Sequence, residues 1–442
     1  MNLRKKALDI LIKVFRDGAY SNLEIASALT GLESGERAFV TRLVYGTISY
    51  KIQADYHLSK YISKPVEKLD IQVLLILESA VYQKWYMDSV PDYAIINESV
   101  NLAKAYKKSS AAGFVNGVLR KALKDSLDIS GLPENTAYYL SIKYSVPKEI
   151  CSVALKQYGA LAEKIIKNCR GEAPFVIRAN TLKCSAEELA GKLAEMQPLH
   201  TEICPHTLKM QGFSVGEDEL FKKGYYYPQD EASALSAYIL SPGPGEKVID
   251  MCAAPGGKTT YLAQLMDNKG EIKAFDLYEH KIKIINNTAK RLGVDIICAE
   301  VADSSAVNEN YRDYADKIMA DCPCSGYGII RKKPELGFSS GKEFEKNISE
   351  IQLEILETAL YYLKPGGEMV YSTCTFNKEE NENNLFKFLE KHKELELCDI
   401  TPYLNGKEFE VSGKGWIQIL PGEYGMDGFF IAKMRKKENG FD

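Results

Sequence analysis

The spacing of apolar residues over the first 130 or so positions predicts helices only. Leu8, Leu11 and Phe15 recur at helical spacing and share one face. Further helices are expected over 71–85, 93–106 and 114–123, with Pro91 and a serine pair between them. We therefore expect a helical bundle over residues 1–135.

The pattern becomes mixed α/β over residues 140–235. Residues 174–180 read as a strand, and 185–196 read as a helix whose Ser185 cap is followed three positions later by Glu188. We expect a small α/β module here. A Pro- and Gly-rich stretch at 241–245 marks its boundary with the next part of the chain.

Strands and helices alternate over residues 240–436. Strands are expected at 247–251, 271–276, 295–299, 317–320 and 368–372, and helices at 259–266, 281–292 and 348–363. This alternation predicts a doubly wound, Rossmann-like α/β domain with a mostly parallel sheet. Two late strands, 416–420 and 429–434, are expected to form an antiparallel hairpin at its edge.

Composition fits a globular protein of more than one domain. The chain has 442 residues, of which 45% are hydrophobic and 26% charged. Apolar runs are too short to cross a bilayer and the N-terminus lacks a signal-peptide layout, so we expect a cytoplasmic protein. The ten cysteines are irregularly spaced, which argues against a disulfide framework or a zinc site, and we expect no metal.

Charge is distributed unevenly despite the net value of −4. Residues 1–150 carry 20 Lys or Arg against 16 Asp or Glu. Basic residues gather near the end of the helical region, at Lys104, Lys107, Lys108, Arg120, Lys121 and Lys124. Solvated helix faces and an RNA-contacting patch both fit this cluster.

A glycine-rich loop, 250–259, follows the first strand of the predicted sheet. Gly256 and Gly257 allow a ligand to approach the backbone, and the following helix N-terminus offers free N–H donors. Asp276, at the end of the next strand, is expected to accept hydrogen bonds from ribose hydroxyls, and Asp303 to meet an adenine amino group.

Two other nucleotide motifs fail at this loop. A P-loop requires glycine at the position of Cys252, and a dinucleotide fingerprint starting at Gly243 would require glycine at Val248. The loop suits the amino-acid end of S-adenosylmethionine. A plain glycine turn that packs helix on strand is the alternative.

Two cysteine segments, 321–326 and 372–375, complete the candidate chemistry. Carbon 5 of cytosine attacks a methyl group poorly until a thiolate adds to carbon 6, which is a case of covalent catalysis. Cys324 and Cys374 each follow a predicted strand, whereas Cys322 is expected to point away. Asp321 is expected to hold the ring as a buried acid whose pKa is raised enough for it to donate a proton.

These segments resemble those of the RNA cytosine-5 methyltransferase family, and within it the RsmB (Sun/Fmu) type that acts on 16S ribosomal RNA. Residues 250–259, 321–326 and 372–374 resemble its cofactor loop and its two cysteine motifs. Segments 36–40 and 113–120 are similar to a NusB-type RNA-binding domain, and 175–181 and 227–233 to an RNA-positioning module. Cys322, where small residues are common, is a mild departure.

The resemblance assigns roles to individual residues. Cys374 is implied as the nucleophile, and Cys324 is implied to assist release of the product. Cys324 is also the alternative candidate for the nucleophile. Lys258 and Asp321 are implied to line the site. The expected S-adenosyl-L-methionine contacts are Cys252, Ala253, Ala254, Pro255, Gly256, Gly257, Lys258, Asp276, Asp303 and Asp321, and the expected RNA contacts are Arg178, Asn180, Lys104, Lys108 and Arg120.

The resemblance implies methylation of carbon 5 of one cytidine in 16S ribosomal RNA, free or within small-subunit particles, by a monomer that does not bind membranes. A transfer-RNA cytosine-5 methyltransferase, an assembly factor with vestigial methylation and an amine or protein methyltransferase are the alternatives. The last class needs no thiol adduct.

Overall fold

The computed structural model describes residues 2–87, 90–211, 218–339 and 342–438. The chain divides into two compact units. One comprises Met1–Gly171 with Ile330–Ser339, and the other comprises Glu172–Ile329 with Ser340–Asp442. Within the described ranges, no helix has the length and apolar content required to span a membrane.

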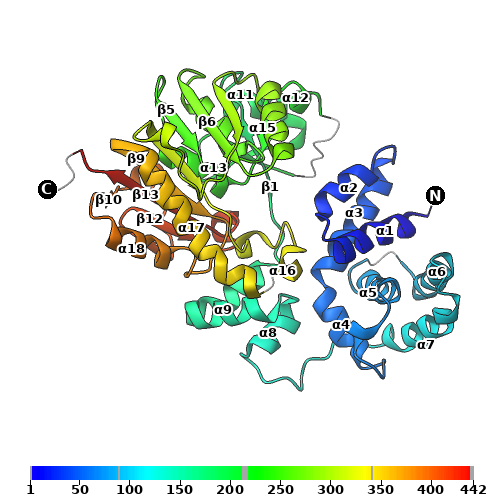
Figure 1. The fold of residues 1–442 in the computed structure, drawn as a ribbon. Coiled ribbons are helices and arrows are strands. Elements are labelled where there is room, and N and C mark those ends of the chain that lie inside the picture. The colour runs from blue at the N-terminus through cyan, green and yellow to red at the C-terminus, as the bar shows by residue number, and fades with distance from the viewer. Residues whose placement is uncertain (1, 88–89, 212–217, 340–341, 439–442) are drawn as a thin grey trace. The chain divides into compact units, whose positions relative to one another are not determined.

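The first unit is helical, as the apolar spacing predicted (Figure 1). A central helix, α5 (Ile71–Tyr86), is buried on all sides from Val73 to Gln83 and forms the core of this unit. The other α-helices described in this unit are α1 (Leu3–Asp17), α2 (Ser21–Ala28), α3 (Ser34–Ser49), α4 (Lys51–Ser59), α6 (Asp92–Ala105), α7 (Ala112–Ala122), α8 (Ala137–Tyr144), α9 (Lys148–Tyr158), α10 (Ala162–Asn168) and α16 (Leu336–Ser339).

Two features of this unit differ from the expected organisation. The boundary falls after Gly171 rather than near residue 140, because α8, α9 and α10 belong to the helical unit. Residues 330–339 also belong to it, although they follow the Cys324 segment in the chain. There the buried Glu335 carboxylate accepts hydrogen bonds from Ser21 N at 3.2 Å and Ser21 Oγ at 2.9 Å.

A small antiparallel sheet opens the second unit. Its order is β2-β3-β1-β4, with β1 (Phe175–Ala179), β2 (Leu199–His200), β3 (Thr207–Met210) and β4 (Tyr226–Pro228). The short helices α11 (Ala186–Lys192) and α12 (Glu219–Lys222) accompany it. Ser185 and Glu188 form the predicted reciprocal cap at the start of α11.

The large sheet has nine strands and is parallel at its centre, which confirms the doubly wound prediction. Its order is β11-β12-β13-β9-β8-β5-β6-β7, with β10 paired to β13. The parallel strands are β5 (Lys247–Asp250), β6 (Glu271–Asp276), β7 (Ile297–Val301), β8 (Ala315–Asp321) and β9 (Leu363–Thr373). The strand order reverses between β5 and β8, and a ligand crevice forms at such a point.

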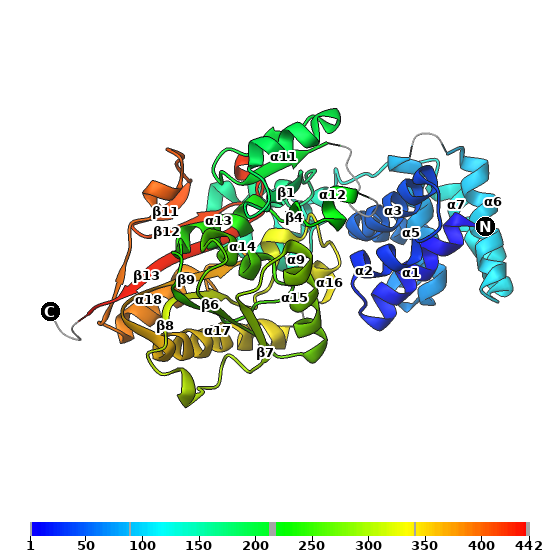
Figure 2. The same cartoon turned by 90° about the horizontal axis from the view of Figure 1, so that it is seen from above.

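Helices cover both faces of this sheet (Figures 1 and 2). Alternate residues of each strand point to opposite faces, so Val248 packs into one core cluster and Ile249 into another. The Val248 face is covered by α13 (Glu231–Leu240), α14 (Gly257–Leu265) and α15 (Glu279–Leu292), and the Ile249 face by α17 (Lys342–Tyr362) and α18 (Glu382–Lys391).

The expected late hairpin is present but does not form the sheet edge. The strands β12 (Trp416–Ile419) and β13 (Phe429–Lys436) pair antiparallel, as predicted. However, β13 also pairs with β9, and β12 pairs with β11 (Val411–Gly413), which is the edge strand. Pairing with β13 gives β9 a partner on each side, so the strand that precedes Cys374 is held in the sheet interior.

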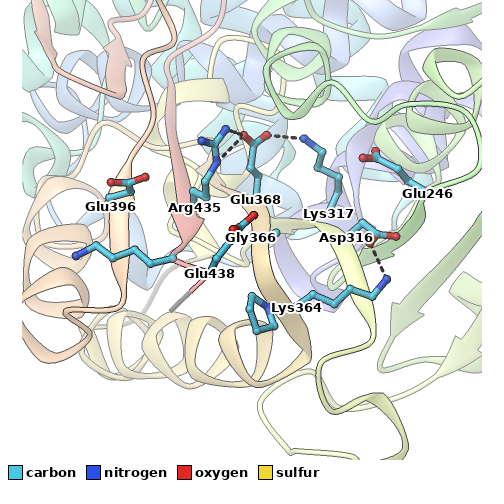
Figure 3. A pocket seen from close by; sticks show the side chains of 12 residues that line it. Glu246, Asp316, Lys317, Lys364, Gly366, Glu368, Glu396, Arg435 and Glu438 are labelled. Carbon is cyan, nitrogen blue, oxygen red and sulfur yellow. Dashed lines mark hydrogen bonds and ion pairs between the residues drawn. The ribbon is translucent and has the colours of Figure 1, made fainter. Parts of the chain in front are cut away.

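A charged pocket of about 550 Å³ lies at the amino ends of β8 and β9 (Figure 3). Glu368 is its central side chain and is paired with Lys317 and Arg435, while Lys364 pairs with Asp316 at 2.6 Å. The candidate catalytic residues lie at the opposite, carboxyl ends of the same strands. We therefore assign this pocket to the framework of the sheet.

Candidate active site

The chemistry-bearing residues gather at the carboxyl ends of the central strands. Asp250 ends β5, Asp321 ends β8, and Cys374 directly follows β9. The three strands are neighbours in the sheet, and β5 and β8 flank the point where the strand order reverses. Ligands of doubly wound sheets bind outside this edge.

The glycine-rich loop has the backbone geometry expected of a ligand cradle. Gly256 has φ of 97°, a conformation that L-residues with side chains rarely adopt, and α14 begins at the next residue. A Cβ atom on Gly257 would lie 2.9 Å from the Tyr227 ring, so a larger residue there would have to displace that ring. The loop thus exposes backbone at a helix N-terminus, which suits a carboxylate.

The two aspartates expected to bind a nucleoside follow neighbouring strands. Asp276 ends β6, is 8% exposed and lies 3.2 Å from Lys281 Nζ. Asp303 is exposed beyond β7, and its Oδ1 accepts hydrogen bonds from Ser305 N and Ser305 Oγ. Their predicted contacts with ribose and adenine remain predictions.

Lys258 and Asp321 form an ion pair beside the glycine-rich loop. Lys258 Nζ lies 2.8 Å from Asp321 Oδ2, and Ser372 Oγ donates to Asp321 Oδ1 at 2.7 Å. Burial acts to lower the pKa of Lys258, but attraction to Asp321, Cys374 and Asp250 raises it above its ordinary value. Both oxygens of Asp321 accept hydrogen bonds, so Asp321 is an acceptor in this arrangement and not the donor that we expected.

The two cysteines that follow β8 and β9 face each other. Cys324 Sγ lies 3.2 Å from Cys374 Sγ, and Cys374 N donates to Cys324 Sγ at 3.3 Å. The hydrogen bond with Cys374 and then burial raise the pKa of Cys324 well above its ordinary value. Either sulfur can donate in this contact, and the raised pKa of Cys324 favours Cys324 as the donor.

The other cysteines of these segments are not part of this pair. Cys322 is 4% exposed and packs into the core on the Ile249 face, which confirms that it points away. Burial raises the pKa of Cys252, whose side chain contacts the same core. A thiol with a raised pKa is a poor nucleophile at neutral pH.

Two sequence families match separate parts of the chain. The family described as 16S rRNA methyltransferase RsmB/F matches residues 237–435, and the NusB family matches residues 1–124. A Bacillus subtilis protein described as probable ribosomal RNA small subunit methyltransferase B is 36% identical over 443 residues, 99% of each chain. The chain belongs to the RsmB/F family of RNA methyltransferases.

Another relative and two solved structures are also similar to this chain. The ribosomal RNA small subunit methyltransferase B of Vibrio vulnificus is 27% identical over 99% of this chain and 100% of its own. The crystal structure of PH0851 covers 98% of this chain and 99% of its own, with a TM-score of 0.84 at 28% identity. NSun6 from Pyrococcus horikoshii, solved with SFG, covers 66% of this chain and 99% of its own, with a TM-score of 0.58 at 28% identity.

Sequence reasoning missed two buried carboxylates of the RsmB/F site. Asp250 is 1% exposed, and burial raises its pKa to about 7. Its Oδ2 accepts a hydrogen bond from Thr259 Oγ1 at 2.7 Å. Glu380 is 1% exposed and accepts a hydrogen bond from Ser325 N at 2.8 Å. Glu380 lies in a polar run after Cys374, and such a run ordinarily indicates a solvated loop.

Arg178 and Asn180 were expected to contact RNA, and the structure corrects this expectation. Arg178 is wholly buried between the Tyr227 and Tyr261 rings, and its guanidinium donates to Gly257 O at 2.6 Å and Thr260 Oγ1 at 3.1 Å. Asn180 is also buried and donates to backbone carbonyls at 2.8 and 2.7 Å. Arg178 therefore fixes β1 to the start of α14, next to the cofactor loop.

The other expected RNA contacts lie in the helical unit, which the NusB family matches. Lys104, on α6, and Arg120, on α7, are exposed. Lys108 is half-buried and pairs with Asp70 at 2.6 Å. Their contact with RNA remains a prediction, and of the three, Lys104 and Arg120 are the more accessible to phosphate.

Proposed function

We propose that the protein methylates carbon 5 of a cytidine in 16S ribosomal RNA, with S-adenosylmethionine as the methyl donor and Cys374 as a transient covalent nucleophile. The observation that carries this proposal is the pair of sulfur atoms 3.2 Å apart, next to the Lys258–Asp321 ion pair at the reversal point of the sheet. Relatives named as small-subunit ribosomal RNA methyltransferases support the substrate class.

The cofactor loop fits S-adenosylmethionine. Its exposed backbone at the α14 N-terminus suits the methionine carboxylate, and Asp276 ends the neighbouring strand where ribose hydroxyls bind in this fold. SFG, an analogue of this cofactor, was solved with the related NSun6. When bound, the cofactor supplies an electrophilic methyl group.

The Cys374 thiolate attacks carbon 6 of the cytosine and forms a sulfur–carbon bond. The carbon 5–carbon 6 double bond shifts to carbon 4–carbon 5 and the carbon 4–nitrogen 3 pair moves onto nitrogen 3, which makes carbon 5 nucleophilic. Lys258 interacts with Cys374 as well as with Asp321 and brings a cation to the thiolate. After carbon 5 has gained the methyl group, it loses its proton to a base. The electron pair of that bond restores the ring double bond, and Cys374 leaves as the thiolate.

The ion pair beside the thiols provides one donor and one acceptor for the base. Lys258 can donate a hydrogen bond to an acceptor atom of the cytosine ring. Asp321 can accept a hydrogen bond from the exocyclic amino group. The donating role that we expected of Asp321 thus passes to Lys258. The target base must be unstacked for the thiol to reach its face.

The test is labelled-methyl transfer to unmodified 16S ribosomal RNA, with transfer RNA as the competing substrate and mass spectrometry of the product nucleoside. We expect 5-methylcytidine in the 16S RNA alone, abolished by Cys374→Ala. Cys322→Ala is the matched control, because it changes a cysteine of the same segment that packs in the core. It should retain methylation.

Each other outcome overturns a defined part of the proposal. Label in transfer RNA alone would overturn the substrate, and a product other than 5-methylcytidine would overturn the reaction. Methylation that survives Cys374→Ala, with no covalent complex on 5-fluorocytidine RNA, would overturn the thiol mechanism.

A further inference from the structure

A buried polar cluster joins the two cysteine loops behind the thiol pair. Ser325 Oγ and Thr375 Oγ1 lie 2.8 Å apart, and Gln352 Nε2 donates to Pro323 O at 2.8 Å. Glu380 is the acidic member of this cluster and lies six residues beyond Cys374. None of these contacts is required by the chemistry proposed above, so the cluster has another role.

Glu380 is a buried carboxylate, and both of its oxygens accept hydrogen bonds. Its Oε2 accepts from Ser325 N at 2.8 Å and from Gln352 Nε2 at 3.4 Å, and its Oε1 accepts from Asn377 Nδ2 at 2.9 Å. An ionised carboxylate is an acceptor only, so this set of partners matches the anion. Burial raises the pKa of Glu380, and the hydrogen bonds from Ser325 and Asn377 oppose that rise.

The two thiols therefore lie in opposite electric fields. Glu380 binds the peptide N–H directly after Cys324, and its charge acts on the Cys324 sulfur. Lys258 acts on Cys374. Tyr371 also lies near Cys324, with its hydroxyl donating to the Glu380 carbonyl oxygen. An anion disfavours a nearby thiolate and a cation favours one.

We propose that Glu380 is a positioning residue that keeps Cys324 as the protonated member of the thiol pair, so that Cys374 alone is the nucleophile. This inference rests on the proposed function. A protonated Cys324 at 3.2 Å donates a hydrogen bond to Cys374 as the carbon–sulfur bond breaks and the electron pair returns to sulfur. An ionised Cys324 would repel the leaving thiolate. Glu380 thus separates the roles of two chemically identical side chains.

The test measures the ionisation of Cys324 in the full-length protein without RNA or cofactor. Cys374→Ala removes the partner thiol, and the rate of Cys324 alkylation by iodoacetamide is followed against pH by peptide mass spectrometry. Adding Glu380→Gln removes the buried charge with little change in shape. We expect Cys324 to alkylate on the order of tenfold faster near neutral pH, with its titration moved to lower pH.

Two further variants separate charge from structure. Glu379→Gln makes the same chemical change at the adjacent exposed position, and should leave the titration unchanged. Glu380→Asp retains the charge while shortening the side chain, and should keep the titration near its original pH even if it weakens the hydrogen bonds. Circular dichroism and thermal unfolding verify that each variant is folded.

Overlapping titration curves for Glu380→Gln and Glu379→Gln would overturn the proposal, as would equal shifts for Glu380→Gln and Glu380→Asp. If Glu380→Gln does not fold, the Glu380→Asp variant decides. This variant keeps the charge, so a fall in the pH at which Cys324 titrates would contradict the inference. Since the assay needs neither RNA nor methyl donor, its result is independent of whether 16S RNA is the substrate.

Discussion

Glu368 provides a quantitative test of how the sheet positions the site. Its side chain is 10% exposed and pairs with Lys317 of β8 and with Lys433, at 3.0 Å, and Arg435 of β13. Lys317, Glu368 and Arg435 are direct partners in register across three strands. Four residues further along β8, Asp321 is opposite Ser372. The charged group (Figure 3) therefore lies in the same strand register as the candidate catalytic residues at the other end of these strands.

The magnitude follows from the pKa of Glu368. Burial alone would raise it, but hydrogen bonds from Lys317, Arg435 and Lys433 outweigh burial and lower the pKa from 4.5 to about 2. One pKa unit corresponds to about 1.4 kcal/mol, so ionised Glu368 stabilises the folded state by about 3 kcal/mol. Because the folded-state pKa is the lower one, this contribution is complete above about pH 4.5 and is lost as the pH falls towards 2.

The perturbation is Glu368→Gln, assayed by urea unfolding of the full-length protein at pH 7 and near pH 2.5. The free energy of unfolding should fall by about 3 kcal/mol at pH 7 and by much less at the lower pH. Glu396→Gln is the matched control from the same pocket, where the carboxylate is exposed, and it should cost less than about 1 kcal/mol. Equal losses for the two variants at pH 7, or an undiminished loss at pH 2.5, would refute the reasoning.

Three other predictions concern the site. Cys324→Ala should accumulate a covalent protein–RNA adduct on denaturing gels, whereas Cys374→Ala should form none; the reverse pattern would exchange their roles. Arg178→Lys keeps the charge but loses the planar guanidinium that donates to Gly257 O. Calorimetry should therefore show S-adenosylmethionine binding weakened by roughly tenfold. The salt dependence of RNA binding should be unchanged. Because burial raises the pKa of Asp250 to about 7, its ionised form is destabilising, so Asp250→Asn should raise the melting temperature at pH 8.5 more than at pH 5.5; a larger gain at pH 5.5 would contradict this.

Local signals located most of the elements. The strand expected at 271–276 is β6, and the helix expected at 281–292 is α15 with two residues added at its start. Both carry strong apolar periodicity, which depends only on which face must be buried. The reciprocal cap of Ser185 and Glu188 was predictable for the same reason, since its partners lie three residues apart.

Other assignments depend on partners that are distant in the chain. Arg178 resembles an RNA-contacting arginine in sequence, yet its hydrogen-bond partners lie 51 to 86 residues away and it is wholly buried. The assignment of 330–339 to the helical unit depends on Ser21, more than 300 residues earlier. No local pattern encodes either contact.

The sequence by itself determined the alternation of strands and helices, the glycine loop, and the two thiols with Asp321 as the candidate chemistry, whereas Lys258 was implied only by the family resemblance. These follow from short-range periodicity and from residue types that few reactions require together. Only the tertiary structure decided that Cys324 lies 3.2 Å from Cys374, that Glu380 is a buried carboxylate beside them, and that Arg178 is enclosed. Distance, burial and the resulting electric field arise when parallel strands align their carboxyl ends, and residues far apart in the chain become neighbours only at that stage.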